Sequence, residues 1–112
     1  MLIENQPKAT LDYETRSACD IRQSGSWKYS LHESTELLCA AFRLPHWAAG
    51  RTGLYHPAFF ELGIEEGENF EDLAEFLQWV IDGGLVESHN SFFEAGIWQN
   101  ICEKKYGWPP LP

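Results

Sequence analysis

The sequence predicts an α/β domain in which a helix crosses over between strands of one sheet. Residues 9–14 alternate apolar and polar side chains, as a strand with one buried face does. Residues 36–44 form a nearly continuous apolar run that ends before Pro45, which is typical of a central strand. Residues 70–82 repeat apolar side chains at helical spacing, and a short strand is expected to follow at 85–89. This order places a helix between two strands of the same sheet.

The remaining elements follow from turn and cap residues. We expect a loop over 17–26, and a strand at 52–56 that forms a hairpin with the central strand. Asn69 is the expected N-cap of the helix at 70–82, and Gly83 and Gly84 are its expected stop. A second helix is expected from about residue 91 to residue 105, with Gly107 ending it.

Composition limits the class of protein. The 112 residues suffice for one small domain, and 44% hydrophobic and 14% aromatic residues exclude disorder as the main state.

The five tryptophans are scattered, so we expect core or rim positions rather than a base-stacking platform. Cys19, Cys39 and Cys102 have neither disulfide-framework nor zinc spacing, which indicates reduced thiols and a cytoplasmic location; Cys102 is expected in the core.

The charge balance is acidic. Seventeen acids against eight bases give a net charge of −9, which works against strong autonomous binding of nucleic acid. Seven of the acids lie between Glu61 and Glu75, with no base among them. Such a run is usually a solvated loop and helix face. The alternatives are a metal site or a surface that mimics DNA.

Asp12 and Glu14 are the first candidate site residues. A period of two places both carboxylates on one face of the predicted strand, with Cα atoms roughly 6.5 to 7 Å apart. Two acids held side by side repel each other, and a divalent cation relieves that repulsion. The alternative is a solvated sheet face.

A second candidate cluster lies at the predicted junction of a strand and a helix, over residues 89–94. Glu94 falls in the first helical turn and can point back toward the end of the preceding strand. The alternative is a capping box, in which Ser91 is the N-cap and Glu94 only satisfies a backbone donor. His89 is either a phosphate partner or simply a histidine at a strand end.

Together, residues 10–17 (TLDYETRS), 35–39 (TELLC) and 88–98 (SHNSFFEAGIW) resemble the start of bacteriophage family-A-type DNA polymerases. That segment is their ribonuclease-H-like 3′–5′ proofreading exonuclease domain, of the four-carboxylate (DEDD) superfamily. The similarity extends from about residue 11 to residue 112. It implies a truncated ribonuclease-H-like fold, with a mixed sheet of three or four strands and two main helices.

The resemblance also assigns roles to individual residues. Asp12 and Glu14 match the first exonuclease motif, and Asn90 and Glu94 match the second, although most of the superfamily has Asp where Glu94 stands. It implies that Asp12, Glu14 and Glu94 are catalytic and hold two Mg²⁺ or Mn²⁺ ions, which activate water and stabilise the leaving 3′ oxygen.

By the same resemblance, Asn90, His89 and Thr15 are expected to contact nucleic acid at a DNA 3′ end. The third motif, a Tyr or His with a later Asp, is missing, because Pro110 stands four residues after Tyr106. We therefore expect residues 1–112 to be one incomplete exonuclease-like domain, encoded by a phage and located in the cytoplasm of the bacterial host.

The sequence leaves three functional hypotheses. The chain is the metal-dependent exonuclease part of a phage polymerase that works only with a missing C-terminal portion, or an acidic phage protein that inhibits a host nucleic-acid-binding or defence complex. The third hypothesis is a fragment with no role of its own. We expect Asp12 to lie beside Glu94. We also expect Phe93, Ile97 and Trp98 to need a partner surface, supplied by a protein partner or a second copy.

Overall fold

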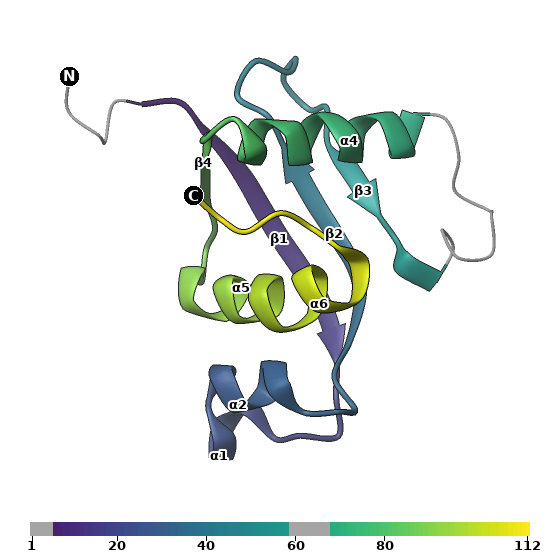
Figure 1. Ribbon diagram of the computed structural model, residues 1–112, viewed down its shortest axis with the longest axis vertical. Coiled ribbons are helices and arrows are strands. Elements are labelled where there is room, and N and C mark those ends of the chain that lie inside the picture. The colour runs from purple at the N-terminus through teal and green to yellow at the C-terminus, as the bar shows by residue number, and fades with distance from the viewer. Residues whose placement is uncertain (1–5, 59–67) are drawn as a thin grey trace.

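The computed structural model describes residues 6–58 and 68–112, which form a four-stranded sheet in the order β3-β2-β1-β4 (Figure 1). β1 (Lys8–Arg16) pairs antiparallel with β2 (Glu36–Arg43), which pairs antiparallel with β3 (Gly53–Tyr55). β4 (Leu85–Glu87) runs parallel to β1, pairing with residues 8–10. The predicted α/β class, the hairpin and the number of strands are confirmed.

The first main helix, α4 (Glu68–Ile81), connects β3 to the parallel strand β4. Its C-terminal end is the predicted one: Gly83 adopts a φ of 88°, and the Gly84 N–H donates to the Trp79 carbonyl at 2.8 Å. The predicted N-cap is wrong, because the helix begins at Glu68 and Asn69 lies within its first turn. Apart from that end, the helical spacing located α4 correctly.

The second main helix runs over the predicted range in three joined segments. They are α5 (Ser91–Ile97), a π-helical segment η2 (Trp98–Cys102) and α6 (Glu103–Tyr106). Gly107 ends the helix in the left-handed conformation, with a φ of 69°. Within η2, the Asn100 side chain donates a hydrogen bond to the Ser30 hydroxyl at 2.9 Å. This contact holds the helix against α2.

The prediction of a loop over 17–26 is wrong in its second half. Two short helices, α1 (Ile21–Ser24) and α2 (Ser26–Leu31), occupy most of 21–31. The Asp20 side chain caps α1 by accepting from the Arg22 N–H at 2.9 Å. Tyr29 and Ser30 of α2 are buried, and Thr35 donates to the Tyr29 carbonyl at 2.6 Å. Local capping and tertiary packing, rather than an apolar period, form these helices.

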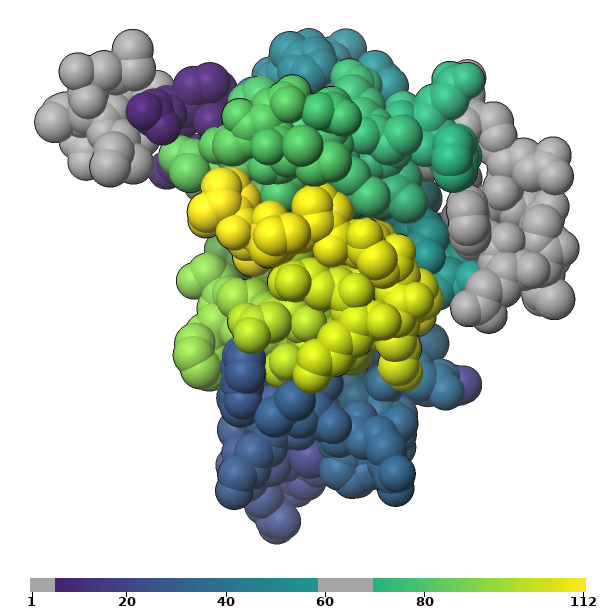
Figure 2. Space-filling model, viewed as in Figure 1, coloured from purple at the N-terminus to yellow at the C-terminus, as the bar shows by residue number. Residues whose placement is uncertain are grey.

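The described helices α4, α5 and α6 lie on one face of the sheet, where they cover the strands (Figures 1 and 2). Beneath them, Phe42 stacks on Phe76 with ring centroids 4.7 Å apart, and Trp98 meets Trp108 edge-on at 4.9 Å. The Trp98 indole donates to the Pro109 carbonyl at 2.7 Å. The expected core or rim positions of the tryptophans are confirmed: three are buried, Trp79 is half-buried, and Trp27 is 40% exposed.

The expectation of a partner surface was based on side chains that pack within the chain itself. Ile97 and Trp98, which the sequence suggested would need a partner surface, are fully buried within the chain itself. Phe93 is half-buried and packs against Tyr29, with ring centroids 5.9 Å apart. These three side chains therefore give no reason to expect a dimer or a hetero-complex.

Candidate functional site

Asp12 and Glu14 project from the face of β1 that no described helix covers. Along β1 the burial alternates, with Ala9, Leu11 and Tyr13 buried and the two carboxylates exposed. The buried set faces the helices, so Asp12 and Glu14 share the open face, as their spacing predicts. The register shifts between Glu14 and Thr15, which pair with Cys39 and Leu37, so the extra residue of the bulge is Leu38 on β2.

Glu94 is positioned by the N-terminal turn of α5. The Asn90 side chain caps this helix by accepting from the Phe93 N–H at 3.3 Å, and the Asn90 carbonyl accepts from the Glu94 N–H at 3.1 Å. Ser91 is already the first helical residue. The capping-box alternative is therefore wrong, since Asn90 rather than Ser91 is the N-cap.

The Glu94 side chain is buried and incompletely satisfied. The residue is 6% exposed, and its Oε2 atom has no hydrogen-bond partner among the described residues. Burial is the main cause that raises the pKa of Glu94, and the charge of Asp12 raises it further. Hydrogen bonds from its own N–H and from Ser88, and the charge of His89, act in the opposite direction. Burial is thus the larger influence on Glu94, and the charge of Asp12 is a smaller one.

A small pocket adjoins Glu94 at the junction of β4 and α5. Its apolar lining includes Leu11, Val86 and Trp98, and Ser88 and Ser91 are polar lining residues beside Glu94. A separate shallow depression, lined by Thr10, Leu11, Glu87, Ser88 and His89, lies beside it. His89 is exposed there, so it is accessible to a bound molecule.

Thr15 does not share the open face with Asp12 and Glu14. It lies just beyond the bulge, is half-buried, and its hydroxyl lies 2.8 Å from that of Tyr29 on α2. This contact gives Thr15 a structural role at the junction of β1 and α2.

The candidate ligands for a metal ion are two carboxylates, those of Asp12 and Glu94. Within residues 6–58 and 68–112, no group of three or more His, Cys, Asp or Glu side chains is arranged to hold a metal ion. Asp12 and Glu94 interact through their charges, and Glu94 keeps a buried oxygen without a partner. Mg²⁺ is commonly held by one or two carboxylates, with water and substrate phosphates as its other ligands. A cation held by Asp12 and Glu94 would therefore need water and substrate phosphates as its remaining ligands.

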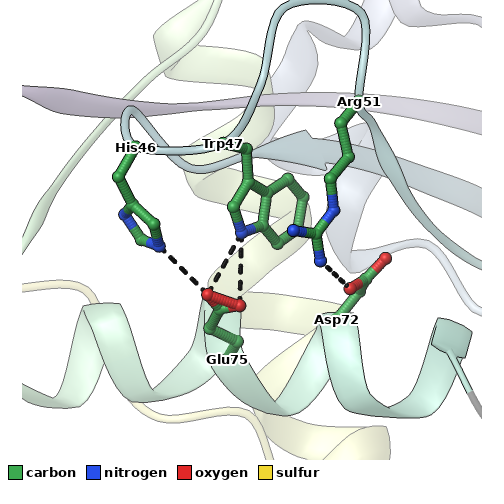
Figure 3. A network of polar contacts seen from close by, with 5 residues as sticks. All are labelled: His46, Trp47, Arg51, Asp72 and Glu75. Carbon is green, nitrogen blue, oxygen red and sulfur yellow. Dashed lines mark hydrogen bonds and ion pairs between the residues drawn. The ribbon is translucent and has the colours of Figure 1, made fainter.

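A second polar cluster was not foreseen from the sequence. The loop after β2 is held to α4 through a set of contacts (Figure 3). Glu75 accepts from His46 at 3.0 Å and from the Trp47 indole at 3.1 and 3.2 Å. Arg51 pairs with Asp72 at 2.6 Å and stacks over the Trp47 ring at 4.1 Å from its centroid.

This cluster changes the interpretation of the acidic run. Residues 61–67 of the run lie outside the described residues. In the described part, Asp72 and Glu75 have basic and aromatic partners, while Glu71 is exposed as expected for a solvated face. No local motif could have indicated this, because the partners are 21 to 29 residues apart in the chain.

No protein-family model, curated protein or solved structure matches the chain. None of the helices in the described parts of the chain is long and apolar enough to cross a membrane.

Proposed function

We propose that this chain carries the divalent-cation site of a 3′–5′ exonuclease that removes nucleotides from DNA 3′ ends. The observation that supports the proposal is Glu94, a buried carboxylate that has an oxygen without a described partner and stands at the start of the helix beside β1, the strand that carries Asp12. Two negative groups in this arrangement repel each other, and a cation that both contact removes the repulsion. The proposed fold is ribonuclease-H-like, and the four-stranded mixed sheet is compatible with it.

The parallel pairing of β1 with β4 supports the proposal. It places the end of β4, and the start of α5 that follows, beside β1. Asp12 of the first proposed motif lies on β1, and Glu94 of the second lies in the helix that begins beside this strand, although 82 positions separate them in sequence. A two-metal exonuclease site likewise uses carboxylates from distant segments of the chain.

Each proposed ligand makes a different contribution. Glu94 offers a buried oxygen whose position is fixed by the helix start that Asn90 caps. Asp12 offers an exposed carboxylate on a rigid strand, and Glu14 stands on the same face two residues further. Bound Mg²⁺ or Mn²⁺ supplies a Lewis acid and lowers the pKa of coordinated water. Asn90 and His89, both exposed beside this edge, are the proposed contacts to the DNA strand, with Thr15 supporting β1.

We further propose that turnover needs groups beyond the two interacting carboxylates, supplied by a protein partner or a second copy. The open face of the sheet, where Leu38 and Leu54 are 43% and 39% exposed, is available for such a partner. We therefore expect the 112-residue chain alone to bind Mn²⁺ weakly and to degrade DNA slowly or not at all.

The test compares Mn²⁺ binding by native protein with Asp12→Asn, Glu14→Gln and Glu94→Gln. Glu33→Gln is the matched control, because Glu33 is an exposed acid in the loop before β2. Electron paramagnetic resonance of free Mn²⁺ should show binding that Asp12→Asn and Glu94→Gln abolish and Glu33→Gln preserves. Release of labelled nucleotides from a single strand in Mg²⁺ and Mn²⁺ is measured in parallel. Unchanged Mn²⁺ binding in both the Asp12 and Glu94 variants would overturn the proposal.

A second candidate function is favoured by the net charge of −9. We propose, as the alternative, an acidic protein that binds a basic nucleic-acid-binding or defence complex and inhibits it. In that case the carboxylate variants would behave like the native chain in every metal and nuclease assay. The native chain would instead displace DNA from such a basic complex, and added salt would weaken that competition.

A further inference from the structure

Arg43 is placed on the open face of the sheet close to Asp12. It is the last residue of β2 and pairs with Thr10 of β1, whereas Asp12 pairs with Ala41. Arg43 and Asp12 are therefore diagonal neighbours on one face of an antiparallel pair, with Cα atoms roughly 7 to 8 Å apart. A guanidinium that stands beside a proposed cation ligand is suited to hold the phosphate that the cation also contacts.

The surface around Arg43 is hollowed on both sides. One depression is lined by Thr10, Asp12, Arg43 and Thr52, and the next by Lys8, Thr10, Arg43 and Pro45. The two share Arg43 and Thr10. A ligand lying along them would meet, in turn, a carboxylate, a guanidinium with two threonine hydroxyls nearby, and the ammonium group of Lys8.

Arg43 differs from two other arginines of the chain in its partners. Arg16 pairs with Glu36 at 2.8 Å and Arg51 pairs with Asp72 at 2.6 Å, whereas Arg43 has no carboxylate partner within the described residues. One Nη2 donor reaches the Trp47 carbonyl at 3.2 Å, and the buried Nε has no described partner. The carbonyl helps to fix the guanidinium, and further Nη donors stay available for an anion.

We propose that Arg43, with Lys8 and Thr10, binds a backbone phosphate of the DNA strand whose 3′ end lies at Asp12. This inference rests on the proposed function for the choice of ligand. It explains how a chain of net charge −9 can hold a polyanion: two cations without described acidic partners stand on the face that carries the site. A cation held at the carboxylates would add a further positive charge near the same strand.

The test measures the affinity of the native chain for a fluorescein-labelled short oligothymidylate by anisotropy, at low salt and without divalent cation. Arg43→Gln should weaken binding about tenfold, as expected for loss of a charge-assisted contact. The matched control is Arg22→Gln, since Arg22 is an exposed arginine on α1, and it should change affinity less than about twofold. The slope of log affinity against log salt concentration should become shallower in Arg43→Gln, by the amount expected for loss of about one phosphate contact. It should stay unchanged in Arg22→Gln.

Additional measurements distinguish a folding defect from a loss of DNA binding. Circular dichroism checks that each variant is folded. If Arg43→Gln is unfolded, the test uses Arg43→Lys and Lys8→Gln, for which we expect smaller losses of affinity. Equal affinity in native, Arg43→Gln, Arg43→Lys and Lys8→Gln proteins would overturn the inference. Inorganic phosphate should compete less well than the oligonucleotide at equal concentration of phosphate groups. Equal competition would overturn the proposal that the ligand is a DNA strand.

Failure of the phosphate site and failure of the proposed function are distinguishable. If Asp12→Asn loses Mn²⁺ while Arg43→Gln binds DNA normally, the cation site stands and the Arg43 site is wrong. If Arg43→Gln loses DNA while Asp12→Asn and Glu94→Gln keep native Mn²⁺ binding, Arg43 binds phosphate and the exonuclease proposal is wrong.

Discussion

Burial, and then the charge of Asp12, raise the pKa of Glu94, although Asp12 and Glu94 lie on different faces of the sheet. Asp12 projects from the open face of β1, and Glu94 is buried at the start of a helix on the covered face. The strand β4 pairs only with residues 8–10 of β1, so it does not extend alongside Asp12. Beyond Thr10, α5 rather than a strand lies beside the edge of β1.

Replacement of Glu94 should stabilise the protein at neutral pH. Because the folded-state pKa of Glu94 is raised above its ordinary value of 4.5, its contribution to stability is present below that value and is lost as pH rises through the folded pKa. Glu94→Gln removes this loss. Its melting temperature should exceed that of the native protein by a few degrees at pH near 7, and the two should converge at pH near 4.

The control for this measurement is Glu33→Gln, an exposed acid for which the difference from native should be small at both pH values. A lower melting temperature for Glu94→Gln at neutral pH would contradict the expectation. Added Mn²⁺ should raise the melting temperature of the native protein but not of Glu94→Gln, if the proposed cation site is right.

The loop that precedes β3 should loosen from α4 when Glu75 loses its charge. Hydrogen bonds from His46 and then from Trp47 lower the pKa of Glu75, so its contribution is present above the ordinary value of 4.5 and is lost as pH falls through the folded pKa. Both members of the His46–Glu75 pair are well exposed, so Glu75→Gln should cost at most about 1 kcal/mol at neutral pH.

Urea unfolding at several pH values measures this difference between Glu75→Gln and the native protein. It should shrink on acidification, as the native carboxylate also becomes neutral. Glu71→Gln is the control, because Glu71 is an exposed acid one turn earlier on α4. An equal effect of the two substitutions would mean that net charge, rather than the contacts of Glu75, determines the stability.

The parts of the fold that the sequence predicted are those with a strong period or an unambiguous stop. The alternation along β1, the apolar run of β2, and the helical spacing of α4 with Gly83 after it are examples. The helices α1 and α2 were missed because they span only four and six residues. Such short helices depend on a cap and on tertiary packing, which leave little periodicity in the sequence.

At the site, the shared face of Asp12 and Glu14 follows from the strand period. Crossover topology predicts Asp12 beside Glu94, and this stays a prediction. The proposed role of Arg43 could not be predicted from the sequence, because it depends on the register that pairs Arg43 with Thr10 and on the absence of an acidic partner among the described residues. A register becomes known only when strands are paired.

Gly53 should not tolerate a side chain. It pairs with Phe42 across β2 and β3, and a Cβ atom at this position would overlap the Phe42 ring. That ring stacks on Phe76 at 4.7 Å, so it has little room to move. Gly53→Ala should lower the free energy of unfolding by about 1–3 kcal/mol in urea titrations. Leu54→Ala, on the exposed side of the same strand, should cost clearly less; equal costs would contradict the steric explanation.

Cys102 should be the least reactive of the three thiols in the native protein. It is fully buried in the π-helical segment, as the sequence predicted for a core residue, and its sulfur lies 3.4 Å from the Tyr13 hydroxyl. Burial, opposed by the Tyr13 hydrogen bond, raises the pKa of Cys102 to about 12. Because only the thiolate is alkylated, its reaction with iodoacetamide at pH near 8 should be extremely slow.

Peptide mapping by mass spectrometry after timed alkylation measures each thiol separately. Cys19 and Cys39 are half-buried, and at least one of them should be modified long before Cys102; all three should react together in urea. Tyr13→Phe removes a contact that lowers the pKa of Cys102, so it should not increase alkylation unless it opens the fold. Native Cys102 reacting as fast as Cys19 would show that the segment around Trp98 and Cys102 opens readily, which would contradict the packed core described for it.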